Sequence, residues 1–235
     1  MAAAKKTAKK KSPAKANEVK DVLRTLEKKA DPQFRRDMSE RYGIVVKKAW
    51  GVRMANILAI AKSCGTDHAL AAALWKSGWY EARLLASMVE DPALVTPAQM
   101  DAWCKDFDNW GVVDTVCFKL WDQTPHAWTK IPKWTKSKDE WVKRAGVVLY
   151  ACVCLHDKGS PDAKFLKLLP LIEKAASDER NFVKKGVSWA LRSLGGKKSP
   201  KLRAAAREVA SRLAASDVAA ERWVGKDVLR GLKAS

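Results

Sequence analysis

Residues 141–144 read Trp-Val-Lys-Arg, residues 182–185 read Phe-Val-Lys-Lys, and residues 223–226 read Trp-Val-Gly-Lys. The three stretches stand 41 residues apart, and each places an aromatic ring first, a valine second and a cation fourth. Each then continues in residues that favour a helix. A period of this length indicates that the chain repeats a unit of two helices, and that each unit stacks on the next.

The rest of the chain also predicts helices. From Val19 onward apolar residues recur three and four positions apart, and no two-residue alternation persists. Glycine and proline divide the chain into about a dozen helices. Pro132 is one expected break, and Ser160-Pro161 and Ser199-Pro200 are expected helix starts with a serine cap. We therefore expect an all-α fold, a HEAT-like or armadillo-like superhelical solenoid of antiparallel helix pairs.

The charge of the chain is strongly positive. Lysine and arginine number 45 against 26 acidic residues, which gives a net charge of +19. The first sixteen residues hold six lysines and no acid, so we expect residues 1–16 to be a disordered basic tail and residues 17–235 to form a single domain. Without those six lysines the net charge is still +13. This favours nucleic acid as the partner, because cations that neutralise phosphates release counterions. A solvated basic surface is the alternative.

The cysteines and histidines predict neither a disulfide framework nor a metal site. The five cysteines and three histidines show no CxxC motif and no ligand-like spacing, so we expect reduced thiols and no metal or other cofactor. The N-terminus lacks the apolar stretch of a signal peptide, and the longest apolar run, residues 147–155, is too short to span a bilayer. We expect a cytoplasmic, nucleoid-associated monomer without an obligate protein partner.

The fourth position of the repeat is a candidate contact for phosphate. In stacked repeats, equivalent positions of successive helices line up along one surface. Arg144, Lys185 and Lys226 are therefore expected to form a basic row that binds DNA phosphates.

The eleven tryptophans are expected to serve packing for the most part. Trp141 and Trp223 occupy the ring position of the repeat. Trp189 departs from the repeat, since the other copies have Val148 and Arg230 at the equivalent positions. It is therefore a functional candidate, with packing as the alternative.

Trp110 and Asp114 are four residues apart and so share one face of a helix. A carboxylate that faced a phosphate-binding groove would oppose phosphate binding, so it would need another task there, such as stabilising a cation. The alternative is that Asp114 is an ordinary solvated or salt-bridged helix residue.

The order of these elements resembles the AlkD-type DNA alkylation repair family, whose members are HEAT-like alkylpurine DNA glycosylases. The resemblance spans residues 37–194 and rests on Trp110 with Asp114, on residues 141–145, on residues 185–192, and upstream on Leu74-Trp75 and Tyr80-Glu81-Ala82-Arg83.

The resemblance also implies roles for individual residues. In that family an aspartate with flanking tryptophans lies against the deoxyribose of the damaged nucleotide, and this implies catalytic roles for Asp114, Trp110 and Trp189. Arg144 would contact phosphate or help to place Asp114. Tyr42 would correspond to an early tyrosine of the family and contact DNA.

The implied chemistry needs few groups. Alkylation at N3 or N7 puts positive charge on a purine, which is then a good leaving group without a general acid. A carboxylate near C1′ can stabilise the developing oxocarbenium ion and orient water, and indole faces favour a cationic nucleotide. The resemblance implies that the lesion can stay in the stack. This chain has Asn109-Trp110-Gly111 where some members have Trp-Trp-Asp.

We therefore expect a monofunctional glycosylase that hydrolyses the N-glycosidic bond of N3- and N7-alkylpurines in duplex DNA. The alternative is a non-catalytic HEAT-repeat protein that binds nucleic acid. A third possibility, a protein-binding scaffold, is disfavoured because the repeated cation positions predict phosphate contacts.

Overall fold

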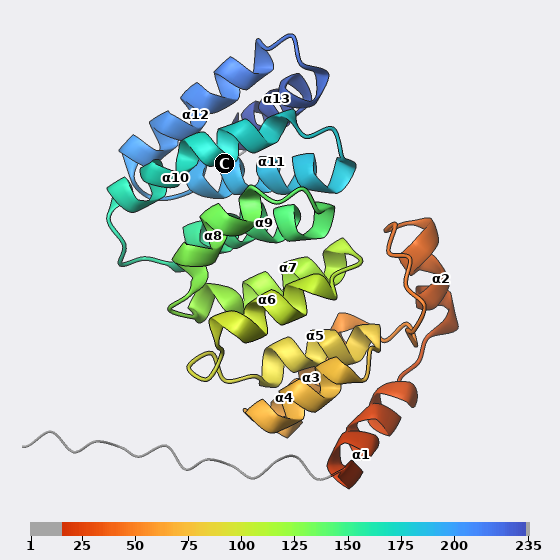
Figure 1. The fold of residues 1–235 in the computed structure, drawn as a ribbon. Helices are drawn as coiled ribbons and strands as arrows, with labels where there is room; N and C mark the ends of the chain where they lie inside the picture. The colour runs from red at the N-terminus through yellow and green to blue at the C-terminus, as the bar shows by residue number, and fades with distance from the viewer. Residues whose placement is uncertain (1–15, 234–235) are drawn as a thin grey trace, which may run out of the picture. The chain divides into compact units, whose positions relative to one another are not determined.

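The structure is a computed structural model that describes residues 16–233 (Figure 1). The tail expected over residues 1–16 lies outside the described residues, except for Ala16, which begins the first helix. Residues 16–233 contain helices and no strand, which confirms the all-α prediction. The contacts divide the chain into two compact units: unit 1 is Met1–Gly43 with Lys47–Asp91, and unit 2 is Ile44–Val46 with Pro92–Ser235. The single domain expected over residues 17–235 stays a prediction, and each unit is described separately.

The described residues of unit 1 form five helices: α1 Ala16–Glu27, α2 Pro32–Glu40, α3 Met54–Cys64, α4 His68–Lys76 and α5 Tyr80–Val89. Its most buried charge is Glu81, in the first turn of α5. The Glu81 carboxylate accepts hydrogen bonds from the backbone N–H groups of Trp50, Gly51 and Val52, at 3.1, 2.7 and 3.1 Å. Glu81 therefore anchors the loop before α3, because these donors replace the water that it loses on burial.

Unit 2 holds the repeat. Its α-helices are α6 Pro97–Lys105, α7 Trp110–Lys119, α8 Ala127–Thr135, α9 Glu140–His156, α10 Asp162–Lys174, α11 Asn181–Gly195, α12 Pro200–Ala214 and α13 Ala219–Lys233, with short 3₁₀ helices η1 Trp121–Gln123 and η2 Ala175–Ser177. The three repeated stretches lie near the starts of α9, α11 and α13. These three helices contact one another in turn and are backed by α8, α10 and α12 (Figure 1).

Contacts between successive copies involve the ring position of the repeat. The rings of Trp141 and Phe182 lie 5.2 Å apart, which agrees with the packing role expected for that position. Trp223, in the third copy, is 36% exposed, and the Lys184 ammonium lies 5.3 Å from its ring centre. In the helix pair α8 and α9, a Cβ on Gly146 would lie 2.3 Å from the Thr135 backbone nitrogen. Only glycine permits α8 and α9 to approach this closely.

One expected helix boundary and one expected cap are wrong, although α10 does begin directly after Pro161. Ser199 caps α12 as predicted, since its Oγ accepts the Leu202 N–H at 3.3 Å. Ser160 does not cap α10, because its Oγ donates to Asp157 Oδ2 at 2.6 Å, and Pro161 occupies the N-cap position. Pro132 lies inside α8. Its ring removes one intrahelical hydrogen bond, but α8 continues because it packs along α9.

An ion cluster joins α6 to α8. The Asp101 carboxylate lies 2.7 Å from the Lys130 ammonium and 2.8 Å from the Lys133 ammonium, and it accepts a 3.1 Å hydrogen bond from the Trp134 indole. Burial opposes ionisation, but these three donors outweigh it and lower the pKa of Asp101 to about 2.

Two further observations concern the described helices and the cysteines. Across residues 16–233, every helix falls short of the length and hydropathy that a bilayer span requires. All five cysteines are unpaired, and four of them are buried.

Candidate active site

The candidate site in unit 2 starts with the N-terminus of α7. Asn109 is buried, and its Oδ1 accepts the Val112 N–H at 3.0 Å, so it caps the helix. The cap puts Trp110 in the first turn and Asp114 one turn later, both half-buried. Asn109, which stands where some members of the resembling family have an aromatic residue, therefore has a structural task.

Asp114 is held by a single arginine from the neighbouring helix α9. Arg144 Nε donates to Asp114 Oδ1 at 2.9 Å, and Arg144 Nη2 donates to Asp114 Oδ2 at 2.7 Å. The side chain of Arg144 is 6% exposed and that of Asp114 is 19% exposed. A two-point contact between planar groups fixes the orientation of the carboxylate as well as its position.

Arg144 also reaches the helix on the other side of α9. Its Nη1 donates to the backbone carbonyl of Phe182, in the first turn of α11. Gly186 provides space at this contact, because a Cβ there would lie 2.9 Å from Val147 Cγ2 and 3.6 Å from Arg144 Nη1. One buried guanidinium thus connects α7, α9 and α11, which follow one another in unit 2 (Figure 1).

The electrostatics of Asp114 combine two opposing effects. Burial raises the pKa of the Asp114 carboxyl, while the charge and the hydrogen bonds of Arg144 act against that rise. Each carboxylate oxygen receives one hydrogen bond from Arg144 and keeps a further lone pair. The arrangement can therefore present an oriented negative charge to a cation or to a water molecule.

The three cations of the repeat differ in their surroundings. Lys185 and Lys226 are exposed, whereas Arg144 is buried against Asp114. The helices that carry them do lie in sequence, but a row of three solvent-facing cations does not form, because α7 and α11 cover Arg144. In this structure Arg144 contacts Asp114, and both functions implied for Arg144 stay predictions.

The remaining expected residues lie on other elements. Trp189 is half-buried on α11, while Trp110 and Asp114 are on α7, so the two halves of the expected site flank α9 (Figure 1). Tyr42 belongs to unit 1, where it follows α2 and is 42% exposed. Its ring centre lies 6.2 Å from that of Phe34 and 5.9 Å from the Arg41 guanidinium.

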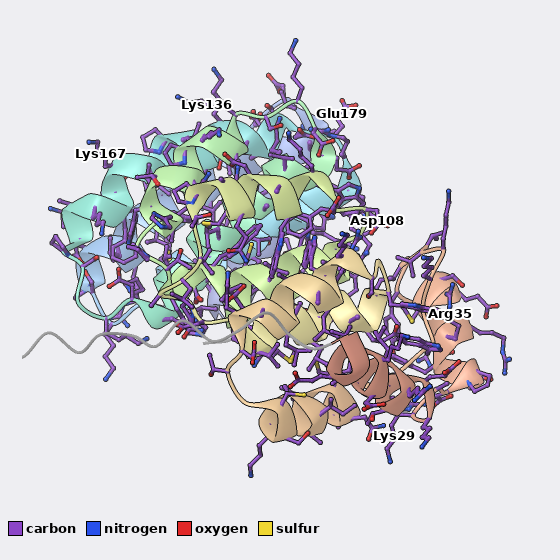
Figure 2. All side chains as sticks on the ribbon, turned by 60° about the horizontal axis from the view of Figure 1, so that its bottom comes forward. Lys29, Arg35, Asp108, Lys136, Lys167 and Glu179 are labelled. Carbon is purple, nitrogen blue, oxygen red and sulfur yellow. The ribbon has the colours of Figure 1, made fainter. Side chains whose placement is uncertain are left out.

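The loops that precede α7, α9 and α11 contain Asp108, Lys136 and Glu179, which are labelled in Figure 2. One contact of these loops follows from no local sequence pattern: Lys143 Nζ lies 2.7 Å from Asp178 Oδ2, and Arg180 binds the same carboxylate at 2.6 Å. The role of Gly186 had such a signal, a glycine inside a helical pattern. No group of side chains in the described part of the chain has the composition and geometry of a metal site.

Comparisons with known proteins agree with this architecture. Residues 22–225 match the model of the family described as DNA alkylation repair enzyme. A solved structure is similar over 91% of this chain and 94% of its own, with 21% identity and a TM-score of 0.75. It is described as belonging to a new family of proteins related to the HEAT-like repeat DNA glycosylases with affinity for branched DNA structures. This likeness confirms the HEAT-like fold.

Two designed armadillo repeat proteins are more distant. One, in complex with the peptide (KR)4, has 11% identity over 92% of both chains and a TM-score of 0.37. The other has 14% identity over 94% of this chain and 95% of its own, with a TM-score of 0.35. No curated protein matches the chain. Because the family model covers most of the sequence, the chain belongs to the DNA alkylation repair enzyme family.

Proposed function

We propose that this protein removes N3- and N7-alkylpurines from duplex DNA by hydrolysing the N-glycosidic bond. The observation that carries the proposal is the half-buried Asp114 carboxylate, fixed by two hydrogen bonds from the buried Arg144. Membership of a family of DNA alkylation repair enzymes supports it. Asp114 is the proposed catalytic carboxylate, and Arg144 is a positioning residue.

The proposed step uses the charge that the lesion already carries. The bond from C1′ to the purine nitrogen breaks, and its electron pair neutralises the cationic base. Water adds to C1′ and loses a proton, which leaves an abasic sugar and a free base. Asp114 stabilises the positive charge that develops on the sugar, and the faces of Trp110 and Trp189 contact the cationic nucleotide.

The proposed grip on DNA is electrostatic. Lys185 and Lys226 are exposed at the same position of successive repeats, so they are the proposed phosphate contacts. Tyr42 is a further proposed DNA contact. The net charge of +19 supports a protein that stays with DNA, hence nucleoid association, and one monomer holds all these residues.

The test is release of base from duplex DNA that contains 7-methylguanine or 3-methyladenine, measured by chromatography under single-turnover conditions. Wild type should release base, and Asp114→Asn should lose at least a hundredfold in rate. Asp217→Asn is the matched control, because Asp217 is exposed in unit 2 and the change in net charge is the same. No release by wild type refutes the proposal, and equal rates for the two variants refute the role of Asp114.

A pH profile separates catalysis from folding. Burial raises the pKa of Asp114, so the rate should fall on the acid side at a pH above the ordinary range of aspartate. Arg144→Gln removes the opposing charge and should move that fall to higher pH in protein that is still folded by circular dichroism. If the profile keeps its position, Arg144 does not act through Asp114.

A non-catalytic DNA-binding protein is the second candidate. Arg144 occupies one lone pair on each Asp114 oxygen, and a relative of the same fold is described as having affinity for branched DNA structures. Fluorescence anisotropy with a four-way junction and a linear duplex of equal length tests this. A marked preference for the junction, together with no base release, favours the second candidate.

A further inference from the structure

A basic cavity lies in unit 2, away from Asp114. It has a volume of about 770 Å³ and opens between the C-terminal ends of α9 and α11 and the loops that begin α10 and α12. The polar residues that line it include Lys158, Asp162, Arg192, Lys197, Lys198 and Ser199. Arg144 and the lining residue Cys154 are ten positions apart on α9, which corresponds to roughly 15 Å along the helix.

The cavity is positively charged, with four cations and one carboxylate in its lining. The carboxylate, Asp162, accepts a 2.5 Å hydrogen bond from Ser199 Oγ. Lys197 is engaged, since its Nζ donates to the carbonyls of Cys154 and Asp157 at 3.0 and 2.8 Å. The other three cations are exposed: Lys158 Nζ donates to the Leu155 carbonyl at 2.5 Å, and Arg192 lies 3.5 Å from the Asp227 carboxylate. Lys198 has no hydrogen bond or ion pair among the described residues. A concave wall of one sign of charge concentrates anions.

The lining favours phosphate groups over a whole nucleotide. None of the described residues that line the cavity is aromatic, so they offer no ring on which a base could stack. Hydroxyl, ammonium and guanidinium groups are the donors that phosphate oxygens prefer.

The cavity also continues the surface that the proposed function assigns to DNA. Arg192 lies seven residues after Lys185 on α11, and both side chains are exposed. This spacing puts them on one face of the helix, about 10 Å apart along its axis.

We propose that this cavity binds phosphates of the DNA backbone beyond the damaged nucleotide. The inference rests on the proposed function only in requiring that the protein bind DNA, and it does not require catalysis. Inorganic phosphate carries the same chemical group as the DNA backbone, and the experiment distinguishes binding of free phosphate from binding of DNA.

The test compares Lys158→Ala/Lys198→Ala with Lys136→Ala/Lys167→Ala. Lys136 and Lys167 are exposed lysines that project from unit 2 (Figure 2), so the control removes the same charge elsewhere. Affinity for undamaged duplex is measured by anisotropy over a range of salt concentrations. The cavity variant should flatten the slope of log K against log salt by about 1.8, that is, about 0.9 for each phosphate contact, and should do so relative to the control.

Three outcomes overturn the inference, and a fourth supports it. Equal slopes for the cavity and control variants, in a protein whose DNA binding still depends on Lys185 and Lys226, overturn the inference alone. Absence of DNA binding by wild type overturns it together with the proposed function. Binding of inorganic phosphate is measured by titration calorimetry. If the cavity variant loses phosphate binding but its DNA slope equals that of the control, the DNA assignment is overturned. A flatter slope, with the single-turnover rate at saturating protein unchanged, supports it.

Discussion

Replacing Arg144 by methionine tests the central contact of the site. The substitution keeps much of the side-chain volume but removes both hydrogen bonds to Asp114 and the bond to the Phe182 carbonyl. The Asp114 carboxylate would then be left half-buried without its cation.

The expected loss of stability follows from burial. Removing one partner of a buried ion pair costs about 3–5 kcal/mol, because the remaining charge is uncompensated. The Asp114 side chain is 19% exposed, so water solvates part of its charge. We therefore expect a loss of about 2–4 kcal/mol in the free energy of unfolding at neutral pH.

The loss should depend on pH. In the variant, burial without Arg144 keeps the pKa of Asp114 in the folded state above its unfolded value of about 3.9. The folded state then holds the proton to a higher pH than the unfolded state. The variant should therefore be most stable below that unfolded value and lose stability as the pH rises through the folded pKa. The difference in the free energy of unfolding between the variant and wild type should be smallest near pH 4, which is about the unfolded pKa, and should increase toward neutral pH.

Urea unfolding at several pH values measures this difference. Arg212→Met is the matched control, since Arg212 binds Glu173 through two 3.0 Å hydrogen bonds but is 51% exposed. An exposed pair contributes about 0–1 kcal/mol. Adding Asp114→Asn to Arg144→Met should recover part of the loss, because it removes the uncompensated charge. If Arg144→Met costs no more than Arg212→Met, Arg144 is not what stabilises the buried carboxylate.

Three further predictions concern unit 2. Lys185→Ala and Lys226→Ala should each reduce the slope of log K against log salt for DNA binding by about 0.9, while Lys167→Ala leaves it unchanged. Equal slopes for all three variants would exclude the repeat cations as phosphate contacts. Gly186→Ala should cost about 1–3 kcal/mol in urea unfolding, because its methyl group would press on a valine of α9, and unchanged stability would contradict that close approach. The stabilisation that Asp101 provides should be complete above its unfolded pKa of about 3.9 and be lost as the pH falls through its folded pKa of about 2. The free energy of unfolding of Asp101→Asn should therefore depend less on pH in this acid range than that of wild type. An unaltered acid transition would contradict this.

Much of the fold follows from the repeat. Apolar spacing predicts helices, and equal spacing of the ring position predicts that α9, α11 and α13 stack, which they do. Pro132 shows where a rule based on local sequence fails. The proline removes one hydrogen bond of α8, whereas the packing of α8 on α9 stabilises the whole helix. Ser160 fails for a related reason, since a nearby carboxylate competes for its hydroxyl.

The site was less accessible from sequence. The spacing of Trp110 and Asp114 was enough to place them on one face of α7. The distance between the Asp114 carboxylate and the Arg144 guanidinium depends on how α7 packs on α9, and no local sequence pattern encodes this packing. The repeat predicted the same environment for Arg144 as for Lys185, although a neighbouring helix covers one and leaves the other exposed.

The link that Arg144 makes between α7, α9 and α11 has a mechanical consequence. A guanidinium is flat and rigid, whereas an ammonium group on a flexible stem cannot hold two partners at a fixed angle. The direction of the Asp114 carboxylate and the position of the first turn of α11 are therefore set by one planar group. Lys185 stands three residues after the carbonyl that Arg144 holds. If Lys185 contacts a DNA phosphate as proposed, a displacement of that lysine would shift the first turn of α11. Through Arg144, the same displacement would change the orientation of the Asp114 carboxylate.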